Sequence, residues 1–371
     1  MGKIKILFFI YQMGAGGAAR TLLNIINNLD REKYQPVLVT LDYNGSYESE
    51  IKDDVIFKKV NTQRLSRSIF KLAKIIRTEK INVVFSTIPR VNTIAILATH
   101  LSFTKAKCVV REASNLDGNF IERLKLRAFG CIYKLSDQVI SLSEGVKKNL
   151  VERYKLKPKD IKVIYNPIDI NEIQNKIATE QLKSEYQALF QSDRKTIINV
   201  GRLVPQKDQA TLIKAFAKIN EQIKSRLIIL GEGPLLEDLT TLTQDLNVSE
   251  HVHFVGFQHN PYLFFESADL FVLTSKFEGF GHVLAEALAT GTPVVSTNCK
   301  SGPAEILENG KYGRLVEVGN VDEIAENILA ILNLAKQPLN DIINKGYQRV
   351  QFFNADKIVK QYQSTFENLI Q

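Results

Sequence analysis

Two glutamates, Glu278 and Glu286, lie eight residues apart in a glycine-rich stretch that predicts a strand, a turn and a helix. Residues 270–274 are apolar and end the predicted strand, Glu278 lies in the turn, and the helix begins near Gly281. A helix N-terminus carries free N–H groups and about half a unit of positive charge, which suits phosphate. Carboxylates repel phosphate, so the two glutamates suit the neutral hydroxyl groups of a sugar and a ribose. The stretch therefore predicts a sugar-nucleotide site.

This pattern, with Gly-Phe-Gly between the glutamates, resembles the signature of retaining glycosyltransferases of family 4. The resemblance implies that Glu278 holds the donor sugar as a catalytic residue and that Glu286 holds the ribose hydroxyls. It also implies that backbone N–H groups at the helix start hold the diphosphate. The donor-binding residues expected here, besides Glu286, are Ser275, Gly279, Phe280, Gly281, His282, Val283 and Leu284.

Two cations, Arg202 and Lys207, follow an apolar run at 195–200 that predicts a strand. Cations leaving one strand end could neutralise a pyrophosphate and stabilise it as a leaving group. Arginine and lysine in a loop are more often solvated surface residues. Beside the paired glutamates, however, the segment resembles the Gly-Arg-Leu…Lys motif of the same family, so we expect both to be catalytic.

Further glycines follow predicted strands. Gly16 and Gly17 lie between a strand at 4–10 and a helix, where their backbone could approach a phosphate or an acceptor oxygen. The spacing matches the dinucleotide fingerprint only loosely, which argues against a dehydrogenase. In the family a glycine pair here lines the cleft opposite the donor. The residue after Gly256 holds the base in the family, which places Phe257 near a uracil; a buried strand end explains Phe257 equally well.

In the first half, Arg111, Glu112 and Asn115 follow a predicted strand, and we expect them on the acceptor side. Many family members have a histidine in this neighbourhood, and this chain has none there, which puts a general base in doubt. No Asp-x-Asp occurs, and the pair His251 and His253 lacks an evident third ligand. We therefore expect no metal and no cofactor, with the nucleotide sugar as substrate.

The composition is that of a folded protein of 371 residues with 44% hydrophobic residues, long enough for two domains. No stretch approaches the apolar length that spans a bilayer. Three widely spaced cysteines fit a reducing cytoplasm. Of the net charge of +8, residues 1–165 hold an excess, with 29 Lys and Arg against 15 Asp and Glu. A basic half favours a polyanion or an anionic membrane, although a solvated surface is the simpler explanation.

Apolar runs alternate with helical patterns, which indicates parallel sheets with helices on both faces. Expected strands are 4–10, 36–41, 81–86, 106–111, 137–142, 195–200, 226–230, 251–255, 269–273, 293–296 and 313–316. The fold class is therefore α/β with two doubly wound Rossmann-like units. The family resemblance implies the GT-B fold, with the units facing across a cleft. We expect an acceptor-binding domain at 1–165, joined by a C-terminal helix at about 355–371, and a nucleotide-sugar-binding domain at 166–354.

Residues 119–135 have apolar side chains at helical spacing with four cations between them. The ordinary explanation is a helix packed on its own sheet. The alternative is a basic surface helix on anionic lipid. Nucleic acid could also attract such charge, but no nucleic-acid motif accompanies it.

The sequence thus predicts a retaining, metal-independent glycosyltransferase that uses a UDP-sugar and a glycan or lipid-linked acceptor in surface-polysaccharide synthesis. We expect it in the cytoplasm, at the inner face of the membrane. Two other functions stay open: a nucleotide-sugar 2-epimerase, and a non-catalytic sugar-nucleotide-binding protein.

Overall fold

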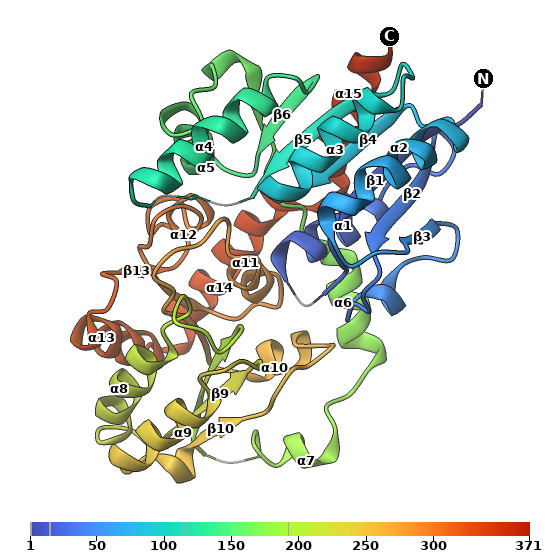
Figure 1. Ribbon diagram of the computed structural model, residues 1–371. Coiled ribbons are helices and arrows are strands. Elements are labelled where there is room, and N and C mark those ends of the chain that lie inside the picture. The colour runs from blue at the N-terminus through green and yellow to red at the C-terminus, as the bar shows by residue number, and fades with distance from the viewer. Residues whose placement is uncertain (1, 15, 114, 117, 192) are drawn as a thin grey trace. The chain divides into compact units, whose positions relative to one another are not determined.

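Two parallel sheets organise the chain in the computed structural model (Figure 1), which describes residues 2–14, 16–113, 115–116, 118–191 and 193–371. Contacts divide it into two units: unit 1 comprises Met1–Pro167 with Ala355–Gln371, and unit 2 comprises Ile168–Asn354. The division falls inside the segment 165–169, where Pro167 disfavours helix at the preceding residue.

Unit 1 is built on a seven-stranded sheet in the order β3-β2-β1-β4-β5-β6-β7, with every pairing parallel. Its strands are β1 (Ile4–Ile10), β2 (Tyr34–Leu41), β3 (Ile56–Val60), β4 (Val83–Thr87), β5 (Lys107–Glu112), β6 (Gln138–Ser141) and β7 (Ile161–Val163). Chain order reverses direction between β1 and β4. Right-handed crossovers therefore place helices on both faces of the sheet.

The helices of unit 1 are α1 (Gly17–Asn27), α2 (Ile69–Thr78), α3 (Pro89–Leu101), α4 (Phe120–Tyr133), α5 (Glu144–Glu152) and α15 (Ala355–Ile370). Helix α3 packs against both α2 and α4, whereas α1 contacts α15. The central strands are mostly apolar, as in β1, where Ile6 to Phe9 are fully buried, because both faces of the sheet are covered there.

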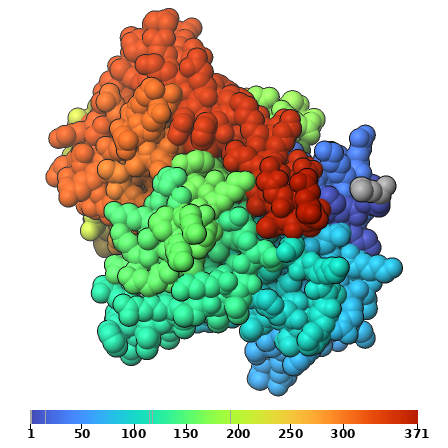
Figure 2. Space-filling view, turned by 90° about the horizontal axis from the view of Figure 1, so that it is seen from above, coloured from blue at the N-terminus to red at the C-terminus, as the bar shows by residue number. Residues whose placement is uncertain are grey.

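Helix α15 joins unit 1 although it ends the chain. Its apolar face packs Tyr362 and Phe366 edge-on against Phe85 of β4. The Tyr34 hydroxyl of β2 donates to Glu367 at 2.6 Å, and Lys162 of β7 donates to Thr365 at 2.8 Å. Figure 2 shows the red C-terminal helix lying beside green and cyan segments of unit 1.

Unit 2 repeats the plan with six parallel strands in the order β10-β9-β8-β11-β12-β13. These are β8 (Lys195–Val200), β9 (Ser225–Leu230), β10 (Val252–Phe254), β11 (Leu270–Leu273), β12 (Val294–Thr297) and β13 (Arg314–Val316). Its helices are α6 (Ile170–Thr179), α7 (Ser184–Gln187), α8 (Gln209–Asn220), α9 (Leu236–Asp245), α10 (Tyr262–Ser267), α11 (His282–Ala289), α12 (Pro303–Ile306), α13 (Val321–Leu332) and α14 (Lys336–Val350).

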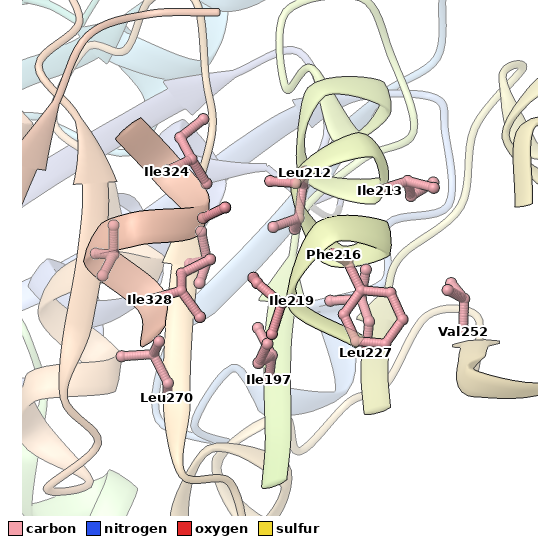
Figure 3. Packing of buried hydrophobic residues seen from close by; sticks show 14 of the residues in the cluster. Ile197, Leu212, Ile213, Phe216, Ile219, Leu227, Val252, Leu270, Ile324 and Ile328 are labelled. Carbon is pink, nitrogen blue, oxygen red and sulfur yellow. The ribbon is translucent and has the colours of Figure 1, made fainter. Parts of the chain in front are cut away.

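One core cluster of unit 2 lies between its sheet and the adjacent helices α8 and α13 (Figure 3). Leu212, Phe216 and Ile219 of α8 pack in this cluster with Ile197 of β8, and Ile324 and Ile328 approach from α13. All six are fully buried. The spacing of four and three residues along α8 places Leu212, Phe216 and Ile219 on one helical face.

The predicted fold class is confirmed, since both units are parallel sheets wound with helices. Each of the eleven expected strands is present, and its observed ends lie within two residues of the predicted ends. The sequence missed β3 and β7, the two outermost strands of the first sheet. No helix among the described residues is long and apolar enough to cross a membrane.

Candidate active site

The candidate site of unit 2 lies at the carboxyl ends of β8 and β11, which are neighbours in the sheet. Lys207 lies in the loop after β8, and Glu278 lies in the loop between β11 and α11. The loops are tied together, since Lys276 donates its backbone N–H to the Gln206 carbonyl at 2.8 Å and Gln206 donates its side chain to the Phe277 carbonyl at 2.8 Å. Parallel sheets bind ligands at this edge.

Glu278 is held through one oxygen of its carboxylate. Its Oε1 accepts a hydrogen bond from Lys207 Nζ at 2.6 Å and another from the Ser275 hydroxyl at 2.7 Å. The residue is 8% exposed. Two donors on one oxygen fix the orientation of the carboxylate, while Oε2 keeps capacity to accept from a neutral hydroxyl group.

Lys207 reaches Glu278 by lying across the end of its own strand. A Cβ placed on Gly201 would lie 3.3 Å from Lys207 Cε, so the glycine leaves room for the lysine stem. Arg202 is exposed, and its side chain makes no ion pair within the described residues. The structure therefore joins Lys207 to Glu278 and leaves the Arg202 guanidinium at the same strand end.

Helix α11 follows directly, and its N-cap is Gly281, whose φ of +93° is a left-handed conformation that favours glycine. His282 and Val283 in its first turn are half-buried. The expectation for Leu284 was wrong, because its amide donates to the Gly281 carbonyl at 2.9 Å and its side chain is fully buried. First-turn amides are the groups that a helix leaves for an external acceptor.

Glu286 lies one turn further along α11 and is 6% exposed. The hydroxyl of Tyr262, from α10, lies 3.5 Å from its Oε1. A buried carboxylate needs hydrogen-bond donors, and Tyr262 was not foreseen as one.

Two residues that were expected to contact the nucleotide sugar, Ser275 and Phe280, make contacts within the protein instead. Ser275 is fully buried and donates to Glu278, so it positions that carboxylate rather than touching a substrate. The Phe280 ring is 2% exposed and packs edge-on against Phe353 at 5.2 Å. Sequence position alone could not show which way these side chains point. Gly279, between them, is half-buried.

Phe257 lies in the wall of a pocket of about 380 Å³ beyond β10. Its ring meets His259 edge-on at 5.0 Å. Residues 180–183 and Tyr186 of α7 also line this pocket. This segment was not predicted as part of the site, since its apolar residues, such as Leu182 and Tyr186, stand in a largely polar stretch. Aromatic and amide groups around such a volume suit a planar ring.

In unit 1, Gly16 and Gly17 begin α1 and are exposed. Gly16 has an ordinary extended φ of −148°, and a Cβ there would meet nothing within 4 Å. Neither backbone conformation nor internal packing requires glycine at that position. The preceding residue, Ala15, lies outside the described residues.

Arg111 and Glu112 do not line a surface, which corrects their assignment to the acceptor side. Both are fully buried. Arg111 donates to Thr87 at 3.0 Å and to Asn166. Glu112 Oε2 accepts from the hydroxyls of Tyr133 at 2.9 Å and Tyr154 at 3.2 Å. These contacts link β5 to α4 and to the loop after α5. Asn115 is half-buried.

The pair His251 and His253 was considered as a possible metal site. His251 lies in a short 3₁₀ turn, His253 lies on β10, and burial lowers the pKa of His253 below its ordinary value. The described residues include no cluster of three or more His, Cys, Asp and Glu side chains suited to a metal.

Family models match both halves of the chain. The model described as Glycosyltransferase Family 4 covers residues 15–172, and the model described as Glycosyl transferases group 1 covers residues 181–349. A relative in Campylobacter jejuni is 30% identical over 96% of this chain and 97% of its own length. It is the N-acetylgalactosamine-N,N'-diacetylbacillosaminyl-diphospho-undecaprenol 4-alpha-N-acetylgalactosaminyltransferase.

Solved structures share the fold at lower identity. The Anabaena protein HepE in complex with UDP-glucose has a TM-score of 0.84 and 22% identity, covering 98% of this chain and 100% of its own. A glycosyltransferase from Rickettsia africae ESF-5 has a TM-score of 0.83 and 18% identity, with both chains covered completely. Two Rossmann-like units of this kind define the GT-B class of glycosyltransferases. Within that class, the chain belongs to glycosyltransferase family 4.

Proposed function

We propose that this glycosyltransferase moves a sugar from a UDP-sugar to a glycan or lipid-linked acceptor, with the anomeric configuration retained and without a divalent metal. One observation carries the proposal: Glu278, buried and oriented through Oε1, lies in the loop that leads into α11. The Campylobacter relative supports the acceptor class, since its name specifies a diphospho-undecaprenol acceptor. The HepE complexes support a UDP-linked donor.

In this proposal unit 2 holds the donor. The Glu278 carboxylate accepts from hydroxyls of the donor sugar, and Glu286 accepts from the ribose. The base enters the pocket walled by Phe257 and Tyr186. First-turn amides of α11 at His282 and Val283, together with Arg202 and Lys207, lower the energy of the departing diphosphate.

The acceptor binds unit 1 beside Gly16 and Gly17, where the backbone is exposed. Asn115 is the remaining acceptor-side candidate, because Arg111 and Glu112 are buried. This division of roles between the units is part of the proposal. Its lipid-linked acceptor places the enzyme at the inner face of the cell membrane.

The transfer step balances without a protein nucleophile. The bond between the anomeric carbon and the β-phosphate oxygen breaks, and its electrons stay on that oxygen. The acceptor hydroxyl oxygen forms the new bond on the same face of the sugar, and its proton passes to the β-phosphate. The products are UDP and a glycoside with the original anomeric configuration.

A panel of UDP- and GDP-sugars tests the proposal. The protein is incubated with each donor and a cell-envelope lipid extract, and products are identified by mass spectrometry. We expect one UDP-sugar to give a lipid product heavier by one sugar, in EDTA as well as in Mg²⁺, with retained configuration by NMR. The Glu278→Gln variant is expected to give no product.

The same assay separates the other two functions. A 2-epimerase would convert the nucleotide sugar into its epimer in the absence of any lipid acceptor. The sugar would stay attached to UDP, and no lipid product would form. A non-catalytic binding protein would shift its melting temperature with a nucleotide sugar yet transfer nothing. Either result, or a requirement for Mg²⁺, would contradict the proposal.

A further inference from the structure

Helix α4 presents an apolar surface to solvent. Phe120 is 81% exposed, Ile121 62% and Leu124 59%, and Leu135, just beyond the helix, is 53% exposed. Large apolar side chains gathered on one surface are unusual and mark an interaction site. In Figure 2 the teal-green segment to which α4 belongs forms part of the surface that faces the viewer.

These exposed residues form a stripe, which we call the α4 stripe. Its members are Phe120, Ile121, Leu124, Ala128, Cys131 and Leu135, all of them exposed. The buried side of α4 consists of Leu126, Gly130 and Tyr133. At 3.6 residues per turn, the centre of the stripe lies about 160° round the axis from that buried side. The helix therefore packs on its own unit with one face and turns an apolar face away from it.

Basic residues flank the stripe on both sides. Arg123, Arg127 and Lys134 fall on one side of the axis and Lys125 on the other, and all four are exposed. The acidic residue of the helix, Glu122, closes a capping box with Asn119 at its N-terminus. An apolar stripe between cations matches a helix that lies in the plane of a membrane interface.

The structure keeps α4 helical without covering the stripe. The capping box satisfies N–H groups at its first turn. At the other end, a Cβ on Gly130 would lie 1.8 Å from the Tyr154 carbonyl oxygen, so only glycine allows this approach. Tyr133 is fully buried and donates to Glu112. The C-terminal end of α4 is thus fixed to unit 1 through Gly130 and Tyr133, and the capping box holds its N-terminal end, while the stripe stays exposed.

We propose that the α4 stripe is a docking surface for an anionic lipid bilayer. Phe120, Ile121 and Leu124 enter the region beneath the headgroups, and the flanking cations contact lipid phosphates. The N-terminal end of α4 follows the carboxyl end of β5, the sheet edge at which parallel units bind ligands. A bilayer there presents a lipid-linked molecule to that edge.

Cys131 allows a direct test, because it lies on the stripe and is exposed, whereas Cys108 and Cys299 are buried. The full-length protein is labelled at Cys131 with an environment-sensitive fluorophore and mixed with vesicles. With phosphatidylcholine–phosphatidylglycerol vesicles we expect a blue shift and co-sedimentation. With phosphatidylcholine alone we expect neither. The readout needs no sugar transfer, so it is independent of the transferase proposal.

Matched variants identify the surface in co-sedimentation of unlabelled protein. The variant Phe120→Ser/Ile121→Ser/Leu124→Ser and the variant Arg123→Gln/Lys125→Gln/Arg127→Gln should each lose about tenfold or more in partitioning. The apolar control is Phe70→Ser/Phe103→Ser, which alters exposed rings outside α4. The charge control removes as many cations elsewhere in unit 1: Lys155→Gln, Lys157→Gln and Lys159→Gln. Both controls should partition like the unmodified protein.

Three outcomes would overturn the proposal. One is equal binding to neutral and anionic vesicles, or binding to neither. Another is a charge control that weakens binding as much as the α4 charge variant, since net charge alone would then explain it. The third is a dimer by light scattering that the apolar α4 variant converts to a monomer, because a second copy would then occupy the stripe.

Discussion

Lys207 Nζ lies 2.6 Å from Glu278 Oε1, although the two residues are 71 positions apart in the chain. Their side chains are 15% and 9% exposed, so the pair is screened little by solvent. The contact spans two neighbouring strands, β8 and β11, and thus fixes the relation between the loops that follow them. Breaking a buried pair leaves one charge without its partner, and this costs more than the pair contributes.

A double-mutant cycle on Lys207→Met and Glu278→Gln should reveal this coupling. Each single variant is expected to unfold more easily in urea, and the double variant should lose less than the sum of the two. A coupling of about 0.5–3 kcal/mol is the range for residues in direct contact. Strict additivity would show that the ion pair does not exist in solution.

Ser275 gives the second prediction, because its hydroxyl orients the carboxylate without reaching a substrate. The Ser275→Ala variant should lower kcat roughly tenfold or more, since a hydrogen bond to a charged group contributes about 1.5–3 kcal/mol. The KM for the donor should change little. Ser267→Ala is a matched control, because that hydroxyl donates only to a carbonyl of its own helix. Equal losses in both variants would indicate general destabilisation.

The three cysteines should differ sharply in reactivity. Burial raises the pKa of Cys108 to about 12, and burial with the Glu278 carboxylate nearby raises that of Cys299 to about 12. Both therefore stay protonated and unreactive at neutral pH, whereas Cys131 is exposed. Ellman's reagent should titrate one thiol per folded chain and three in guanidinium. Fast reaction of a second thiol in the folded protein would contradict the structure.

His253 predicts a pH dependence of stability. Burial, with Arg226 and His251 nearby, lowers its pKa, so the unfolded chain binds a proton more readily than the folded chain. Stability should therefore fall as the pH drops below the ordinary histidine value of about 6.5. Denaturant midpoints for the unmodified protein and His253→Gln at several pH values measure this. The variant should show a shallower decline on the acid side; an unchanged slope would rule His253 out.

Most of the fold could be read from the sequence because strands covered on both faces are continuous apolar runs. The two that were missed have a common cause. β3 reads Ile-Phe-Lys-Lys-Val and is partly exposed, and β7 is only three residues long. Both are edge strands, where charge and short length guard against further pairing. Apolar patterning therefore fails where the sheet ends.

The candidate site could be read from the sequence where the residues are neighbours, and not where partners are remote. Glu278 and Glu286 share one strand–turn–helix segment, and both are buried. Arg111 and Glu112 are the last two residues of β5. Their partners lie more than twenty positions away in sequence: Asn166 accepts from Arg111, and Tyr133 and Tyr154 donate to Glu112. Sequence position locates a strand end, whereas side-chain direction depends on such distant contacts.

Tyr133 tests whether this buried network anchors α4. Its hydroxyl donates to Glu112 at 2.9 Å and accepts from Asn92 at 2.8 Å, and the ring is fully buried. Tyr133→Phe keeps the ring and removes both hydrogen bonds, so the unfolding free energy should fall by about 1–3 kcal/mol. Hydrogen exchange should accelerate within residues 120–133 more than in α3. Tyr43→Phe serves as the control, because its hydroxyl bonds only Tyr11 and a carbonyl near the surface. Faster exchange throughout unit 1, rather than in α4, would show that the network stabilises the sheet and does not hold the helix in particular.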